Sequence, residues 1–304
     1  MSHGVHSVVQ GARSARTRLA LTAGLFVTSL ALVFALPGSA LAACPDGGAA
    51  APGDVSGASA GRTHVSHPEL DWMGSTIRAH EGSGRSGAPG TVTPLVTQTP
   101  GLDVSGYQGN VDWGTVWANG AKFAYVKATE GTTYTNPYFT QQYNGSYNAG
   151  LIRGSYHFAL PDVSTGSAQA DYFIAHGGGW SADGKTLPGA LDIEYNPYGA
   201  TCYGLSASGM VSWIQSFSSE YQARTGRYPT IYTSTTWWSQ CTGNSSAFGT
   251  TNALWIARYN TSVGDLPAGW GVQTFWQFSD SGTFPGDQDR FNGALDRVQA
   301  YAKG

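Results

Sequence analysis

The chain has 304 residues, enough for one large domain or two small ones. Charged residues make up only 12% of the chain and aromatic residues another 12%, a composition that excludes a solvated, disordered chain. The formal net charge of -3 leaves no basic surplus for binding phosphates, so we expect no nucleic-acid partner.

The first 42 residues are typical of an export signal. Arg13, Arg16 and Arg18 precede an uncharged apolar run over 19–36, and small residues at 40–42 follow at the spacing of a cleavage site. We therefore predict a signal peptide over 1–42 and a secreted, extracellular protein. The alternative is a membrane anchor, for which the apolar run is long enough.

Three cysteines follow, and an exported chain lies where disulfides persist. We expect Cys202 to pair with Cys241, since both fall in the folded part of the chain. Cys44 is left over. It is either a free thiol near the mature N-terminus or, because the residues before it resemble a lipobox, a lipidated tether, which is the only membrane contact we expect.

Residues 43–98 are rich in Ala, Gly, Ser, Pro and Thr, which predicts a mostly disordered linker or pro-segment. An island over 66–77 interrupts this composition, and Ser66 with Glu69 three residues later predicts the start of a short helix. The island is either a pro-segment that masks the rest of the protein or an ordinary linker.

From 99 to 304 the pattern changes to alternating strands and helices, which predicts an α/β domain, either a parallel barrel or a doubly wound sheet. Helices are expected over 113–119, 138–149, 167–176 and 206–224. Strands are expected over 101–104, 123–128, 152–158, 190–194, 230–233, 253–257 and 274–278. The last strands leave little room for helices between them, which favours a barrel whose late helices are short or missing.

Several kinds of site are missing from this domain. Its two histidines, His157 and His176, have no metal-ligand spacing, and we expect His157 to be hydrogen-bonded within a strand. There is no phosphate loop and no Gly-x-Ser-x-Gly nucleophile motif. Carboxylates and aromatic residues remain, which are the groups a glycosidase uses without metal or cofactor.

The strongest local signal is Asp192 and Glu194 on one predicted strand. Residues two apart on a strand point to the same face, so these carboxyl groups should lie together. At the C-terminal end of a barrel strand they would reach the catalytic mouth. Two close carboxylates do not both ionise readily, so one of their pKa values should be raised, which provides a proton donor beside an anion.

Six motifs in order resemble the family 25 glycoside hydrolases, the Chalaropsis-type lysozymes. They lie at 101–113, 123–131, 153–158, 190–194, 275–279 and 287–292. The resemblance implies an irregular TIM-like (β/α)5(β)3 barrel that cleaves between N-acetylmuramic acid and N-acetylglucosamine in peptidoglycan, with retention. Because the general acid must stay protonated, we expect an acidic pH optimum. It also implies a monomer associated with the cell wall.

The resemblance further implies roles for individual residues. Glu194 is the general acid and Asp192 its partner, which stabilises positive charge or orients the substrate acetamido group. Asp103 and Asp289 complete the acidic cleft, with Asp289 preferred over Asp287. The expected sugar-binding residues are Lys127, Tyr134, Tyr156, Tyr232 and Trp276. Trp237 and Trp238 are expected in the core instead.

Two other functions remain open at this stage. A wall-binding module that has lost turnover would keep the same cleft. A chitinase-like glycosidase would also use an Asp-x-Glu strand, but with a further acidic residue two positions earlier, where this chain has Ala190.

Overall fold

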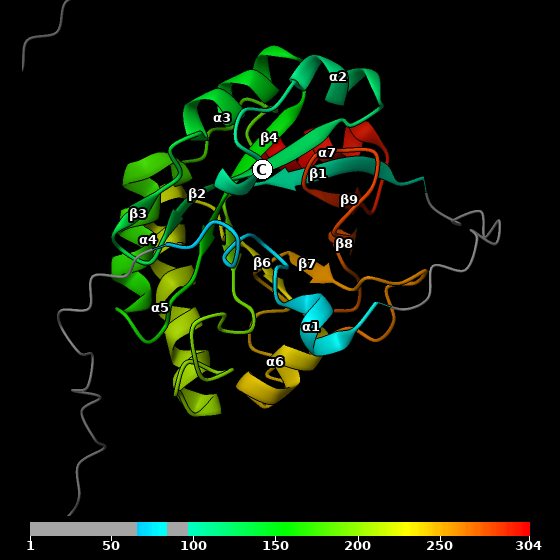
Figure 1. Ribbon diagram of the computed structural model, residues 1–304. Coiled ribbons are helices and arrows are strands. Elements are labelled where there is room, and N and C mark those ends of the chain that lie inside the picture. The colour runs from blue at the N-terminus through cyan, green and yellow to red at the C-terminus, as the bar shows by residue number, and fades with distance from the viewer. Residues whose placement is uncertain (1–65, 84–96) are drawn as a thin grey trace, which may run out of the picture. The chain divides into compact units, whose positions relative to one another are not determined.

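The computed structural model describes residues 66–83 and 97–304, drawn in colour in Figure 1. The predicted signal peptide, Cys44 and most of the Ala/Gly/Ser-rich stretch lie outside these residues. Within the described part, no helix is both long and apolar enough to cross a membrane.

Eight strands close into a barrel. In barrel order they are β1 (Thr99–Val104), β2 (Phe123–Glu130), β4 (Ile152–Phe158), β5 (Ala190–Asp192), β6 (Thr230–Thr233), β7 (Leu254–Ala257), β8 (Phe275–Ser279) and β9 (Asp287–Phe291). Neighbours from β1 to β8 pair in parallel, and β9 pairs antiparallel with both β8 and β1. The short β3 (Tyr134–Thr135) adds a hairpin to the end of β2.

Five helices connect the first six parallel strands: α2 (Trp113–Ala118), α3 (Phe139–Asn148), α4 (Gly166–Phe173), α5 (Ala207–Thr225) and α6 (Thr235–Thr242). A helical turn, η2 (Ile174–Gly178), extends α4, and η1 (Gly106–Gln108) follows β1. No such helix separates β7, β8 and β9 in this fully described region, and α7 (Leu295–Lys303) ends the chain. The predicted (β/α)5(β)3 barrel is thus confirmed, whereas α6, α7 and β9 were not among the expected elements.

The helix boundaries follow from local chemistry, as α5 illustrates. The Ser206 hydroxyl accepts the Gly209 N–H at 3.2 Å and caps the first turn. Gly226, in the left-handed region at φ +79°, ends the helix and donates its N–H to the Gln222 carbonyl. The sequence signals for this helix are therefore correct at both ends.

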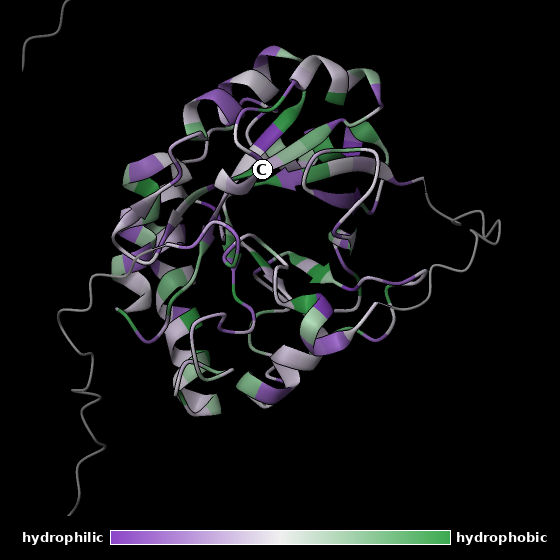
Figure 2. Cartoon of the chain, in the orientation of Figure 1, coloured by the Kyte–Doolittle hydropathy of each residue, from purple (hydrophilic) through white to green (hydrophobic). Residues whose placement is uncertain are grey.

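The barrel interior below the mouth is filled by aromatic side chains, and Figure 2 shows apolar colouring on parts of its strands, whereas β9 is largely hydrophilic. Tyr125 and Trp255 pack with ring centroids 4.7 Å apart, and Phe275 lies 5.5 Å from Trp255. His157 points the other way, toward the helices, and its ring nitrogens bond Thr129 and Gln169. Because burial lowers the pKa of His157 to about 3, it is a neutral packing residue, as expected.

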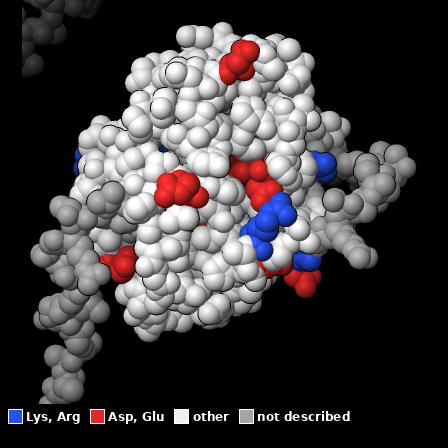
Figure 3. Space-filling model, in the orientation of Figure 1, with Lys and Arg blue, Asp and Glu red and all other residues white. Residues whose placement is uncertain are grey.

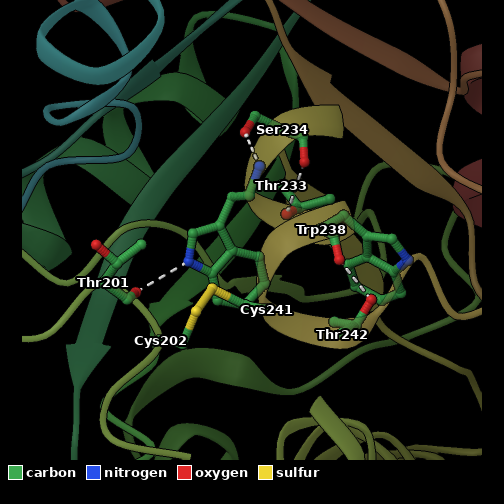
Figure 4. Close-up of a disulfide and its surroundings, with 8 residues drawn as sticks. Thr201, Cys202, Thr233, Ser234, Trp238, Cys241 and Thr242 are labelled. Atoms are coloured by element: carbon green, nitrogen blue, oxygen red, sulfur yellow. Dashed lines mark hydrogen bonds between the residues drawn. A yellow bond between two sulfur atoms is a disulfide. The ribbon is translucent and has the colours of Figure 1, made fainter. Parts of the chain in front are cut away.

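Cys202 and Cys241 form a disulfide with their Cα atoms 5.3 Å apart, which confirms the expected pair (Figure 4). The bridge ties the loop after β5 to the end of α6. The indole of Trp237 donates to the Thr201 carbonyl beside it, and both Trp237 and Trp238 are fully buried in the core.

Residues 66–83 differ from the sequence expectation. No helix begins at Ser66, because the Ser66 hydroxyl and the His67 N–H both donate to the carboxylate of Asp71 and close a turn instead. The helix α1 begins later, at Ile77, and ends at Glu81.

Candidate active site

Five acidic residues line one end of the barrel interior: Asp103, Asp192, Glu194, Asp287 and Asp289. Asp103 and Asp192 lie at or next to the C-terminal ends of their parallel strands, where barrel enzymes place their chemistry. Each of the five is at most 2% exposed. Figure 3 shows exposed acidic side chains beside basic ones near the middle of one face, and the five buried carboxyl groups lie beneath the surface.

Asp192 and Glu194 come from the end of β5, as predicted. The Ile193 N–H still donates to the Tyr232 carbonyl of β6, so the extended backbone continues past the last strand residue. Burial, followed by the charge of Glu194, raises the pKa of Asp192 well above its usual value. Burial also raises the pKa of Glu194 to about 7. The two groups therefore favour a state in which at least one carries a proton.

Asp192 differs from Glu194 in its hydrogen bonding. Neither carboxylate oxygen of Asp192 accepts a hydrogen bond from the described residues. Both oxygens of Glu194 do accept, from the Gly74 N–H at 2.6 Å and the Thr76 hydroxyl at 2.5 Å. These two donors belong to the segment 66–83 and not to the barrel.

Asp287 and Asp289 point to the same side of β9 but at different depths. Asp287 pairs in register with Asp103, whereas Asp289 pairs with Gly101, one layer further into the barrel. Asp289 accepts the indole N–H of Trp255 at 3.0 Å. Burial and the nearby Asp103 raise the pKa of both Asp287 and Asp289, but only for Asp287 is Glu194 among the contributing charges. Asp287 is thus the acidic residue of β9 at the mouth.

Gln277 on β8 connects this cluster, although the sequence analysis did not single it out. Its amide nitrogen donates to Asp103 and to Asp287, both at 2.8 Å. Its amide oxygen accepts from the hydroxyls of Tyr232 at 2.6 Å and Tyr259 at 3.1 Å. Gln277 therefore holds two carboxyl groups and two phenols in one network. The alternation of β8 would have indicated it, since Gln277 follows the inward-facing Phe275 by two positions.

Lys127 is fully buried at the same mouth. Its ammonium group donates to Glu130 at 2.6 Å, to the Asp71 carboxylate at 2.7 Å and to the Asp71 carbonyl at 2.5 Å. Burial opposes its charge, but Glu130 and Asp71 outweigh burial and raise the pKa of Lys127. It remains a cation in a site of mostly acidic groups.

The predicted aromatic residues divide into two groups. Tyr156 and Tyr232 reach the mouth, where the Tyr156 hydroxyl accepts the Met73 N–H at 3.2 Å, and the Tyr134 ring lies 5.2 Å from the Lys127 nitrogen. Trp276 does not join them. It lies on the opposite face of β8 from Gln277, because successive strand residues alternate, and its indole donates to the Arg258 carbonyl.

An α/β barrel whose mouth holds several buried carboxyl groups, with pKa values raised by burial, is typical of a glycoside hydrolase. The comparisons with known proteins agree. Residues 102–287 match the family model "Glycosyl hydrolases family 25", and the chain belongs to this family.

Relatives support the same assignment. The chain is 53% identical to the N,O-diacetylmuramidase of Chalaropsis sp over 208 residues, 67% of this chain and 99% of that protein. It is 42% identical to Lysozyme M1 of Streptomyces globisporus over 298 residues, 95% of this chain and 96% of that protein. The solved muramidase from Trichobolus zukalii superposes with a TM-score of 0.67 and 56% identity, and covers 68% of this chain and 99% of its own.

Proposed function

We propose that this glycoside hydrolase is a lysozyme that cuts the β-1,4 bond from N-acetylmuramic acid to N-acetylglucosamine in bacterial peptidoglycan. The observation that carries the proposal is the buried pair Asp192 and Glu194 at the end of β5. The relatives named lysozyme and N,O-diacetylmuramidase support this choice of substrate.

Glu194 is the proton donor in this mechanism. A pKa raised to about 7 keeps a proton on the group in mildly acidic solution, and that proton passes to the leaving glycosidic oxygen. As the bond breaks, positive charge develops on the ring carbon, and negative groups on the opposite side stabilise it.

Asp192 is the partner that faces the reacting sugar. Because neither of its oxygens is bonded by the described residues, it has acceptor capacity for the acetamido N–H or the developing cation. Asp103 and Asp287, held by Gln277, form the other wall of the cleft. We assign this wall to Asp287 rather than Asp289, because Asp289 lies one layer deeper against Trp255.

Tyr156, Tyr232 and Tyr134 are the proposed sugar-contacting residues, with Lys127 placed for a carboxylate or carbonyl of the glycan. The proposal also includes the export predicted from residues 1–42, residues 99–304 as the catalytic domain, and action as a monomer at the cell wall.

Product analysis tests the proposal. Purified peptidoglycan is digested with residues 97–304, which correspond to nearly the whole chain of the solved Trichobolus zukalii relative, and is then reduced with borohydride. Mass spectrometry should find reduced muramic acid at the new ends. Reduced glucosamine at the ends would reassign the bond to a chitinase-like specificity. Bound protein on intact glycan would identify a binding module.

A further inference from the structure

Segment 66–83 crosses the mouth of the barrel, and its helix α1 lies beside the mouth in Figure 1. Its central residues Asp71, Met73 and Ile77 are fully buried, although they precede the barrel in sequence. The contacts come from the segment's backbone and side chains alike, and they reach groups to which the mechanism above assigns catalysis or substrate binding.

We propose that the cleft is a docking site for this segment, which acts as an intramolecular inhibitor and occupies the place of the glycan. The proposal rests on the function proposed above, because inhibition presupposes an active site in this cleft. Four sets of contacts carry it.

The first set engages Glu194. The Gly74 N–H and the Thr76 hydroxyl take one carboxylate oxygen each, and Glu194 is fully buried beneath them. With both oxygens bonded and covered by the segment, Glu194 has no access to a glycosidic oxygen.

The second set engages Lys127. Its three donated hydrogen bonds include two to Asp71, one to the carboxylate and one to the carbonyl. The Asp71 carboxylate also accepts from the Tyr198 hydroxyl at 2.8 Å. Burial alone would raise the pKa of Asp71, but Lys127 and the hydrogen bonds to Asp71 outweigh it and hold this pKa well below its usual range. The contact is therefore a buried ion pair across the cleft.

The third set engages the segment's backbone. The Met73 carbonyl lies 3.1 Å from the Gln277 amide nitrogen and shares its N–H groups with Asp103 and Asp287. The Gly74 carbonyl lies 3.0 Å from the Tyr259 hydroxyl and shares its proton with the Gln277 amide oxygen. The Met73 N–H donates to Tyr156, as described above. Backbone polar groups of the segment thus face the polar network around Gln277 and the proposed sugar-contacting residue Tyr156.

The fourth set lies at the two ends of the contact. Trp72 stacks on the exposed Tyr107 with ring centroids 6.5 Å apart, and His80 stacks on Tyr195 at 4.0 Å. Arg78 donates from Nε and Nη2 to the two carboxylate oxygens of Asp280. The segment therefore covers the cleft along its length and not at Glu194 alone.

Gly74 is the residue that this fit requires. Its φ is +86°, and a Cβ there would meet the Tyr259 hydroxyl at 2.3 Å, the Gln277 amide oxygen at 2.4 Å and the Tyr232 hydroxyl at 2.7 Å. Gly82 has a similar φ of +72°, but a Cβ there would meet nothing within 4 Å. Alanine at either glycine strains the backbone, but only alanine at Gly74 collides with the barrel. Comparing the two variants therefore separates the effect of backbone strain from the effect of lost docking.

The relatives show that the barrel does not need this segment to form an enzyme. The alignment with the Chalaropsis sp muramidase spans 208 residues and nearly that whole protein, which is as long as 97–304 of this chain. The alignment with Lysozyme M1 covers 95% of this chain and so includes residues before the barrel.

The test compares the full chain with its Gly74→Ala and Gly82→Ala variants. Peptidoglycan hydrolysis by Gly74→Ala should exceed that of the parent by about tenfold or more, whereas Gly82→Ala should match the parent. Asp71→Asn, which weakens the Lys127 contact, should also raise activity. A synthetic peptide of residues 66–83 should inhibit the Gly74→Ala chain competitively.

Hydrogen–deuterium exchange provides a readout that does not need turnover. Backbone amides near position 74 should be protected in the parent and in Gly82→Ala, and exchange rapidly in Gly74→Ala. Equal hydrolysis by the parent, Gly74→Ala and Asp71→Asn would overturn the inhibitor proposal. If no form hydrolyses peptidoglycan, the proposed function fails, and protection confined to the parent and Gly82→Ala would still establish docking.

Discussion

Gln277 donates to Asp103 at 2.8 Å and so ties the last parallel strand of the barrel to the first. The same amide group reaches Asp287, Tyr232 and Tyr259. A glutamine suits this position because it supplies two donors to the carboxyl groups and an acceptor to the phenols.

Gln277→Glu should destabilise the protein more than Gln277→Met. The glutamate would add a further acidic group beside two buried ones, whereas methionine removes the hydrogen bonds without adding charge. Each unsatisfied buried group costs about 1–3 kcal/mol, and an unpaired charge costs more. Urea denaturation at neutral pH measures the difference, and equal midpoints for the two variants would refute this role of Gln277.

Asp287→Asn should lower kcat/KM far more than Asp289→Asn. Asp287 lies beside Asp103 at the mouth, so its loss should cost about 100-fold, the size of effect seen when one group that stabilises transition-state charge is removed. Asp289 lies a layer below and keeps its contact with Trp255 as an asparagine. Steady-state hydrolysis by residues 97–304 distinguishes the two, and a greater loss for Asp289→Asn would restore the assignment expected from the sequence.

The Asp287 result illustrates what the sequence alone resolves. The Asp-x-Glu pair and the order of strands follow from local pattern, because alternation and the ends of parallel strands determine where such side chains point. The choice between Asp287 and Asp289 depends on register with β1, and both residues share one face of β9. The two-residue alternation of a strand shows which residues face inward, but it does not show how deep in the barrel each one lies.

Trp276 and the segment 66–83 show two other limits. Trp276 was expected at the sugar because aromatic residues suit sugars, but the inward position of β8 belongs to Gln277. The segment was placed in a flexible stretch because its neighbours are rich in small residues. Its contacts include groups 56 and 204 positions away, which composition does not reveal.

Activity should fall as the pH rises through about 7. Burial raises the pKa of Glu194 to about 7, so the group holds its proton below that pH and loses it above. A required acid gives a descending limb of about tenfold per pH unit in kcat/KM beyond its pKa. A pH–rate profile of the full chain, in which residues 66–83 help to bury Glu194, measures the limb, and activity that stays constant from pH 5 to 9 would contradict it.

Replacement of both Cys202 and Cys241 by serine should lower thermal stability but spare the active site. The bridge spans a sequence separation of 39, and closing such a loop contributes about 3–4 kcal/mol in the chain-entropy model. For a domain of this size the melting temperature should fall by roughly 10 °C. Calorimetry measures the shift, and hydrolysis at 25 °C should remain near that of the parent. An unchanged melting temperature would exclude a stabilising role.

The most direct test of the central claim is the turnover of Glu194→Gln in residues 97–304 on purified peptidoglycan. Glutamine keeps the shape of the side chain but has no acidic proton, so turnover should fall by about three orders of magnitude or more while the melting temperature stays near that of the parent. Retained full turnover by a folded Glu194→Gln variant would contradict the account, because another group would then have to supply the proton.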